Sequence, residues 1–392
     1  MGRGIATSNI TKKYILNKVS QITIFSVYFD ISVEQIKYCI ETGNTICSPI
    51  REDKHPTCGF AYNNNGKLKM RDFAGYFWGD CFDAVAFVLS TINQRPYNIS
   101  NKNDFITVLK HITNTFKDIF YGKEKDANFN NEIKQSLEII KKQKAIIELV
   151  IRDWNEDDKK YWSKFHIDFQ LLNTNFIYPI DQYYINRKIN PEPKYYYNPK
   201  DPCYGYLLGV DRNNIHNIKL YFPYRNHSET RFITNCNHLE GIYNFDRNDY
   251  DYILITKSTK DRLALKSAIN HFFKGDKYKD KIGLINIPNE TYHLRDFEYD
   301  WICSKASDNC KITSLMDNDE TGIKESKYLR DTFNIIPLLI PRKYQNKDFA
   351  EFVSVNTKEE IKSLIDKTLK YLNAYENNAH IRKKEESDIE PF

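Results

Sequence analysis

The last third of the chain alternates short apolar runs with helical repeats. The apolar runs occupy residues 252–256, 282–287, 312–316 and 335–340. Two stretches between them repeat apolar or small residues at helical spacing: Leu265, Ala268, Ile269 and Phe272, and then Gly322, Ser326, Leu329 and Phe333. Strands that alternate with helices are joined by crossover connections. The pattern therefore predicts a mainly parallel sheet over 248–353, with its functional groups at the carboxyl ends of the strands.

The first 121 residues predict a small separate domain. Short aromatic segments with turn signals begin at Ile31 and close in a helical repeat that ends at Leu89. A second helical pattern covers 104–120. Residues 122–134 are polar and aperiodic, which is typical of a linker.

Residues 135–247 predict a mixed α+β segment. It contains an expected strand at 146–151, a helix capped by Asn155, and short aromatic runs broken by Pro and Asn. After the parallel sheet, Thr357 and Glu360 have the spacing of a capping box and start an amphipathic helix within 354–380. The tail 381–392 has no apolar stripe, so we expect it to be disordered.

Composition narrows the class of protein. A length of 392 residues allows two or three domains, and the net charge of +5 permits nucleic-acid binding without demonstrating it. The eight cysteines form no C-x-x-C pair, which favours buried reduced thiols over a zinc knuckle. Because no apolar run is long enough to span a bilayer and no signal-peptide pattern begins the chain, we expect a cytoplasmic protein with no membrane partner.

Two carboxylates spaced by one residue follow the apolar run at 312–316. In the sequence Leu-Met-Asp-Asn-Asp-Glu-Thr-Gly, Asp317 and Asp319 stand where the strand is expected to end. Alternate residues at such a position point toward one divalent cation, and hard oxygen ligands suit Mg²⁺ or Mn²⁺. The same pattern is equally typical of a turn that caps a helix, so the motif by itself leaves both interpretations open.

The order of motifs around these aspartates resembles the Toprim domain that DnaG-type primases share with topoisomerases. That domain has a strand ending in Glu-Gly, an Asp four residues after that Glu, a strand ending in Asp-x-Asp with a Gly shortly after, and a final loop containing Asp. The matching positions here are Asp261, Asp317, Asp319, Gly322 and Asp348. The resemblance implies a Rossmann-like parallel sheet, a metal held by Asp317, Asp319 and Asp348, and a catalytic part for Asp261.

The chain departs from this family at the first motif. Lys257 stands where the family has its Glu, and Ser258 replaces the Gly. An ammonium repels a divalent ion and offers it no lone pair, so one metal instead of two is expected. Alternatively, Lys257 is itself catalytic and contacts the triphosphate or the nascent strand, or it is a solvated lysine on an inactive site.

Three N-terminal stretches, at 47–57, 69–75 and 79–85, resemble the zinc-ribbon domain that begins DnaG-type primases. Ser48 and Arg51 replace the first Cys and His of that domain, and Asp72 and Gly75 stand near its second ligand pair. We therefore predict a ribbon-like fold without zinc, in which an Arg51–Asp72 ion pair replaces the metal. A less favoured alternative is a metal site made by four cysteines, Cys39, Cys47, Cys58 and Cys81.

Basic and aromatic residues provide candidate contacts to nucleic acid. The predicted phosphate or template contacts are Arg51, Lys54, Arg71, Lys219, Arg231 and Lys260. Bases of single-stranded DNA would stack on the rings of Phe73, Tyr76 and Trp78. The alternative is that Phe73, Phe77 and Trp78 fill a small core.

Taken together, the resemblance implies a DNA primase of a phage or mobile element. Such a nucleotidyltransferase makes short RNA primers from NTPs on a single-stranded DNA template during DNA replication. No G-x-x-x-x-G-K-[ST] loop occurs, so the replicative helicase of the primosome would be a separate partner. The alternative function is a catalytically altered Toprim protein that acts as a DNA-binding accessory factor or as a metal-dependent nuclease.

Overall fold

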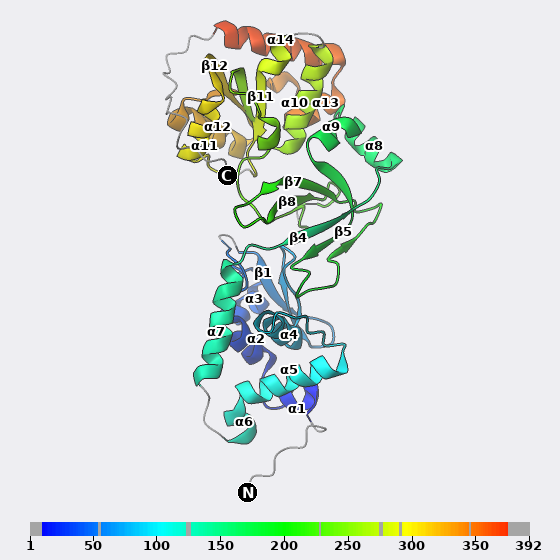
Figure 1. The fold of residues 1–392 in the computed structure, drawn as a ribbon, viewed down its shortest axis with the longest axis vertical. Helices are drawn as coiled ribbons and strands as arrows, with labels where there is room; N and C mark the ends of the chain where they lie inside the picture. The colour runs from blue at the N-terminus through cyan, green and yellow to red at the C-terminus, as the bar shows by residue number, and fades with distance from the viewer. Residues whose placement is uncertain are drawn as a thin grey trace. The chain divides into compact units, whose positions relative to one another are not determined.

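The computed structural model describes residues 10–53, 56–122, 127–226, 229–273, 277–289, 292–344 and 346–374 (Figure 1). The chain divides into two compact units, each made of several segments. The first comprises Met1–Val150, Asp181–Asp201 and Phe222–Asn235, and the second comprises Ile151–Ile180, Pro202–Tyr221 and Cys236–Phe392. Each unit is described separately below.

The first unit combines seven helices among its described residues with a three-stranded antiparallel sheet of order β1-β2-β3. The helices are α1 (Lys12–Leu16), α2 (Gln21–Phe29), α3 (Val33–Thr42), α4 (Cys81–Ile92), α5 (Lys102–Thr115), α6 (Lys117–Tyr121) and α7 (Ala127–Lys142). The strands are β1 (Cys58–Tyr62), β2 (Leu68–Asp72) and β3 (Trp78–Asp80). The sheet and helices share one apolar core, in which nearly every side chain of α4 is buried.

The junction between β3 and α4 is built by two adjacent residues. Asp80 caps the helix and accepts hydrogen bonds from the backbone N–H of Phe82 (2.8 Å) and of Asp83 (3.2 Å). At Gly79 a Cβ would lie 2.4 Å from the Cβ of Asp83, so only glycine fits there. The Gly-Asp pair thus sets the turn that brings β3 onto the buried helix.

Helix α7 begins at Ala127, inside the stretch 122–134 that the sequence predicts to be a linker. Its polar residues lie on a helix that buries Ile133 and Leu137 in the core of the first unit. The correction has a simple cause, since a helix that presents only a narrow apolar stripe gives a weak periodic signal. The first unit also includes all but the last residue of β4 (Ile147–Ile151), together with β6 (Tyr195–Tyr196), β9 (Phe232–Thr234) and the second half of β5 (Ile177–Ile185).

The second unit begins with helices α8 (Glu156–Ser163) and α9 (Phe169–Thr174). Asn155 caps α8 through a capping box with Asp158, as the sequence predicts. The first residues of β5 pair antiparallel with β7 (Tyr204–Val210), which pairs antiparallel with β8 (His216–Tyr221). A 3-10 turn, η2 (Ile242–Asn244), leads from these strands to the rest of the unit.

A four-stranded parallel sheet forms the rest of the second unit and confirms the fold expected for the last third of the chain. Its order is β11-β10-β12-β13, and each strand is parallel to its neighbours. The strands are β10 (Tyr250–Thr256), β11 (Ile282–Asn286), β12 (Ala306–Leu315) and β13 (Ile336–Leu338). The helices and 3-10 turns are α10 (Thr259–Phe272), η3 (Lys277–Lys281), α11 (Asp296–Ser304), α12 (Glu320–Phe333), η4 (Arg342–Tyr344), α13 (Phe349–Val355) and α14 (Lys358–Ala374).

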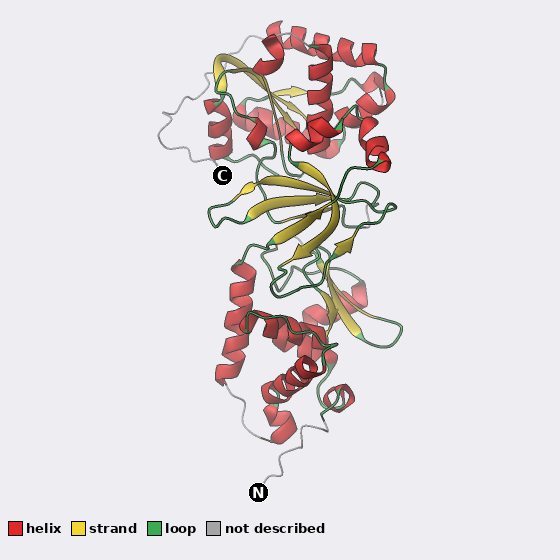
Figure 2. Ribbon diagram, turned by 45° about the vertical axis from the view of Figure 1, so that its right-hand side comes forward, coloured by secondary structure: helices red, strands yellow, loops and turns green. Residues whose placement is uncertain are grey.

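Helices cover both faces of this sheet (Figure 2). Tyr252 and Leu254 of β10 belong to a core shared with α10, α13 and α14, whereas Ile253 and Ile255 belong to one shared with α11 and α12. Alternate residues of a strand point to opposite faces, which explains this division and the continuous apolar run. Thr357 and Glu360 form the predicted capping box before α14, and residues 381–392 lie outside the described part.

The cysteines are free thiols, and six of the eight are buried, as predicted. None of the helices in the described ranges has both the length and the apolar character needed to cross a membrane.

Candidate metal centre

Three aspartates from separate segments of the second unit converge. Asp261 lies in the first turn of α10, Asp317 follows β12, and Asp348 caps α13. Each offers a carboxylate oxygen, and these oxygens lie within 4.8 Å of one another. We call this group the aspartate triad. Segments that follow parallel strands meet at one edge of the sheet, which is where the sequence predicts the site.

The backbone of Asp317 is held by close contact with α12. At Gly322 a Cβ would lie only 2.2 Å from the carbonyl oxygen of Asp317, so the helix approaches the strand end more closely than any other residue allows. The Asp317 side chain is 1% exposed. Within the described part of the chain, its Oδ1 atom is buried and has no hydrogen-bond partner. A buried carboxylate oxygen without a partner is uncommon and indicates a missing ligand.

Two lysines neutralise the other oxygen of Asp317. Lys257 forms an ion pair with Oδ2, and Lys347 lies 3.1 Å from the same atom. Lys347 also lies 2.8 Å from Oδ2 of Asp319, and these carboxylates raise its pKa. Burial raises the pKa of Asp317, and the hydrogen bond from Lys257 opposes that rise. The lysines therefore fix one oxygen of Asp317 and leave Oδ1 available.

Asp261 is buried between the N-termini of two helices. Its Oδ2 accepts a hydrogen bond from Ser258 Oγ (2.5 Å), and its Oδ1 accepts one from the backbone N–H of Ala350 (2.9 Å). Burial, together with the charge of Asp348, raises the pKa of Asp261 to about 7. At neutral pH this group is thus divided between its acid and its carboxylate.

Asp319, which the resemblance implies as a metal ligand, lies outside the triad. It caps α12 by accepting a hydrogen bond from the backbone N–H of Gly322 (2.9 Å), and that bond lowers its pKa. The triad contains Asp261 in its place. Each interpretation of the Asp-x-Asp motif therefore applies to one of its aspartates. Asp317 belongs to the candidate metal cluster, and Asp319 is a helix cap.

The donor set fits a single hard divalent cation. Three carboxylates supply only oxygen ligands, which Mg²⁺ and Mn²⁺ prefer, and the unpartnered Oδ1 of Asp317 offers one of them. Two ammonium groups beside Asp317 reduce the net charge of the cluster. This charge balance favours one ion over two.

Lys219 is not positioned to contact a phosphate, so its predicted contact with nucleic acid is corrected. It is buried on β8, where Nζ donates to Glu240 Oε1 (2.6 Å) and to the carbonyl of Pro288 (2.7 Å). Glu240 also accepts hydrogen bonds from Thr259 (2.6 Å) and Asn286 (3.0 Å). The lysine is therefore committed to an internal polar network.

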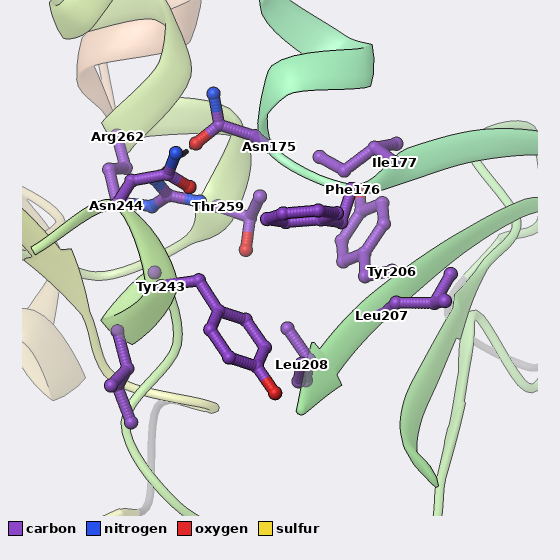
Figure 3. A pocket seen from close by; sticks show the side chains of 12 residues that line it. Asn175, Phe176, Ile177, Tyr206, Leu207, Leu208, Tyr243, Asn244, Thr259 and Arg262 are labelled. Carbon is purple, nitrogen blue, oxygen red and sulfur yellow. Dashed lines mark hydrogen bonds between the residues drawn. The ribbon is translucent and has the colours of Figure 1, made fainter. Parts of the chain in front are cut away.

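Arg262 extends this network to a small hollow (Figure 3). Its guanidinium donates to Asn286 (2.9 Å) and to Asn175 (2.8 Å), and burial lowers its pKa to about 10. The rings of Phe176 and Tyr243 meet in the hollow with their centroids 5.6 Å apart. No sequence pattern predicts this hollow, because its lining comes from β5 and the loop before it, from β7, from η2 and from α10.

Two other predicted basic residues are half-buried. Lys260 lies 4.7 Å from the ring centre of Phe165, and the carbonyl of Arg231 accepts a hydrogen bond from Phe222. Lys54 lies outside the described residues.

In the first unit, Arg51 forms the predicted ion pair with Asp72, at 3.1 Å. Asp72 also accepts a hydrogen bond from Ser48 Oγ (2.9 Å), and Arg51 lies 3.2 Å from Asp53. The Asp72 side chain is fully buried, and that of Arg51 is largely buried. The positions matching the ribbon's ligands thus form one hydrogen-bonded polar cluster. Arg51 is engaged in it.

Cation–aromatic pairs lie on the sheet beside this cluster. Lys69 Nζ is 4.0 Å from the ring centre of Trp78, and the Arg71 guanidinium is 4.9 Å from that of Phe73. Trp78 is 68% exposed and Phe73 is partly exposed, whereas Phe77 is buried in the core. Phe77 therefore fills the core, as one alternative predicts, whereas the rings of Phe73 and Trp78 lie at the surface, where the other alternative places them.

Comparisons with known proteins add little. No protein-family model matches the sequence, and no curated protein matches it. Among solved structures, the chain is similar to a chain in the structure of bacteriophage T7 lagging-strand DNA polymerase interacting with primase domains of two gp4 subunits bound to an RNA/DNA hybrid and dTTP. The identity is 12% and the TM-score 0.31, over 57% of this chain and 96% of that one. Similarity at this level decides nothing about function.

Proposed function

We propose that this chain is a Toprim-type DNA primase that joins NTPs into short RNA primers on single-stranded DNA. The observation that carries the proposal is the aspartate triad beside a parallel sheet of order β11-β10-β12-β13. Metal-dependent nucleotidyl transfer needs clustered hard oxygen ligands, and the triad supplies them at the edge of the sheet. The motif order from Lys257 to Asp348 gives the same assignment from the sequence.

Each residue near the triad has a distinct part in this proposal. Asp261, Asp317 and Asp348 would hold one Mg²⁺ or Mn²⁺ ion, which supplies positive charge to the phosphates of the reacting nucleotide. Lys257 and Lys347 keep Asp317 in one orientation through its Oδ2 atom. Their ammonium groups also place positive charge where a second ion would otherwise act.

Template binding is assigned to the first unit. Trp78 and Phe73 present exposed rings, and Lys69 and Arg71 hold cationic groups against them. Exposed rings stack on unpaired bases, and the neighbouring cations contact phosphates. This combination suits single-stranded DNA. A separate helicase would supply the unwound template.

One observation favours a second candidate function. The ammonium of Lys257 is bound directly to Asp317, the central residue of the triad, and so competes with a metal for that carboxylate. A weak metal site is compatible with a DNA-binding accessory protein, and a one-metal site is compatible with a nuclease. We keep both as the alternative outcomes of the experiment below.

The test is primer synthesis on varied single-stranded templates with labelled NTPs and Mg²⁺ or Mn²⁺. Asp317→Asn should abolish primer formation and leave template affinity unchanged in fluorescence anisotropy, because Asp317 is far along the chain from the template-binding rings. Asp331→Asn is the matched control, since Asp331 is an exposed aspartate on the neighbouring helix α12. It should behave like the wild type.

Three results would decide against a primase. Primer synthesis that survives Asp317→Asn removes the triad from the reaction. A wild type that binds template but makes no primer under any condition supports the accessory function. Metal-dependent cutting of DNA without NTPs supports the nuclease.

A further inference from the structure

A second, small hollow adjoins the triad. Seven residues line it: Lys257, Ile287, Met316, Asp317, Thr321, Gly322 and Glu325. It therefore reaches from the end of β12 to the second turn of α12. Asp317 belongs both to this hollow and to the triad, so a molecule bound at the triad would extend toward Glu325.

Glu325 has an unusual environment for a carboxylate. Its side chain is 5% exposed, and its Oε1 atom is buried without a hydrogen-bond partner among the described residues. Oδ1 of Asp317, on the same hollow, is also buried and unpartnered. Buried polar atoms without partners are rare and need an explanation. Both atoms belong to residues that line one hollow beside the proposed metal site, so a polar group that enters it would find two unused acceptors.

The helix gives Glu325 this orientation. Glu325 follows Gly322 by three residues, so the two lie on the same side of α12. Gly322 is the point at which the helix presses against Asp317. The contact that fixes Asp317 thus also brings Glu325 to the hollow.

The other oxygen of Glu325, Oε2, contacts a solvent-exposed histidine. His293 Nδ1 lies 3.3 Å from Glu325 Oε2, and the His293 side chain is 67% exposed. The ring of Tyr328 lies against His293, with centroids 4.8 Å apart. A purely structural ion pair would satisfy the buried carboxylate on both sides. Here one oxygen contacts an exposed imidazole, and the other is buried without a partner in a residue that lines the hollow.

We propose that Glu325 is the general base of the reaction and that His293 returns its proton to solvent. This assignment rests on the proposed primase function. The attacking 3′-hydroxyl gives its proton to Oε1 of Glu325 while its oxygen bonds to the α-phosphorus, and the bond from that phosphorus to the bridging oxygen of pyrophosphate breaks. The carboxyl group of Glu325, now neutral, then rotates so that its protonated oxygen faces His293, gives the proton to the imidazole, and the imidazolium releases it to water.

The charges around Glu325 agree with this assignment. Burial raises the pKa of Glu325, with an opposing contribution from His293. A base that titrates closer to neutrality transfers protons more effectively at physiological pH. The other charged or titratable groups facing it are Lys257 and Asp317 across the hollow and Tyr328 on its own helix.

The experiment measures the rate of primer extension against pH for three variants. Glu325→Gln should lower kcat by about 100-fold or more above about pH 8, where the Asp261 carboxylate is ionised, with little change in KM for the NTP. His293→Ala should lower kcat less, and added imidazole should restore it, because the exposed position is open to a small base. Asp331→Asn on the same helix should leave every value unchanged.

The outcomes separate this inference from the function on which it depends. An active wild type, an inactive Asp317→Asn and a Glu325→Gln variant with normal kcat and pH profile would overturn the general base alone. A wild type that makes no primer overturns both proposals. Thermal melting checks the fold of Glu325→Gln. If that variant unfolds, the imidazole experiment decides, and a His293→Ala variant that keeps full activity or gains nothing from imidazole refutes the relay.

Discussion

Replacing Gly322 with alanine tests how the triad is held together. In an ordinary helix interior, Gly→Ala stabilises a protein by about 1 kcal/mol. At Gly322, however, the new Cβ would lie 2.2 Å from the carbonyl oxygen, 2.7 Å from the nitrogen and 2.8 Å from the carbonyl carbon of Asp317. All three contacts are with backbone atoms, so no side-chain rotation relieves them. Either α12 or the strand end must move.

The sign of the stability change therefore distinguishes an ordinary helix glycine from one that is packed against the backbone of Asp317. Overpacking of this kind costs about 1–3 kcal/mol, and the helix-propensity gain offsets only part of it. We expect Gly322→Ala to lower the free energy of unfolding by about 1 kcal/mol, where an unhindered site would raise it by about 1 kcal/mol. A displacement of Asp317 also separates its oxygens from those of Asp261 and Asp348, so Mn²⁺ affinity should fall at least tenfold.

Urea unfolding and calorimetric Mn²⁺ titration measure the two effects. Lys324→Ala, at an exposed position on the same helix, is the control and should change stability by less than about 0.5 kcal/mol. A Gly322→Ala variant that is more stable than the wild type and binds Mn²⁺ normally would refute the close packing of α12 on Asp317.

Three further predictions concern charged or exposed groups. Lys219→Met leaves Glu240 buried without its cation and should cost about 3–5 kcal/mol in urea unfolding with template affinity unchanged; a loss of affinity at normal stability would contradict the internal network. The pKa of Asp261 rises from 3.8 to about 7 on folding, so the stability that it contributes is full below about pH 4 and is lost as pH rises through 7; Mn²⁺ binding needs the carboxylate and should strengthen over that range. Stability and affinity profiles that Asp261→Asn leaves unchanged would exclude this titration. Trp78→Ala should weaken template binding by about 1–3 kcal/mol in anisotropy, whereas loss of stability alone would assign the ring to the fold.

The parallel sheet was predictable because buried strands and amphipathic helices alternate regularly along the sequence. Continuous apolar runs gave β10 and β11 nearly to the residue. Helices α11 and α13 escaped prediction, since α13 has only seven residues and α11 mixes charged with aromatic positions. Short helices depend on tertiary packing more than on their own periodicity.

The candidate site was predictable only in part. The strand-end position of Asp317 followed from its place after an apolar run, and the proximity of Lys257 followed from the parallel order. The sequence did not show that Asp261, and not Asp319, completes the triad, because a helix cap and a metal ligand use the same residue types. The place of Glu325 beside the hollow depends on how closely α12 approaches the strand, and that distance leaves no trace in a periodic pattern.

The three carboxylates of the triad come from positions spread over 87 residues of the chain. An unfolded or partly opened chain cannot present them together, so affinity for an ion belongs to the assembled sheet alone. A metal ion bound to the triad would therefore stabilise the assembled site by mass action. It would slow the opening of α10, α12 and α13 as one event. Proteolytic digestion with and without Mn²⁺ would follow that protection through fragments that begin or end in these three helices.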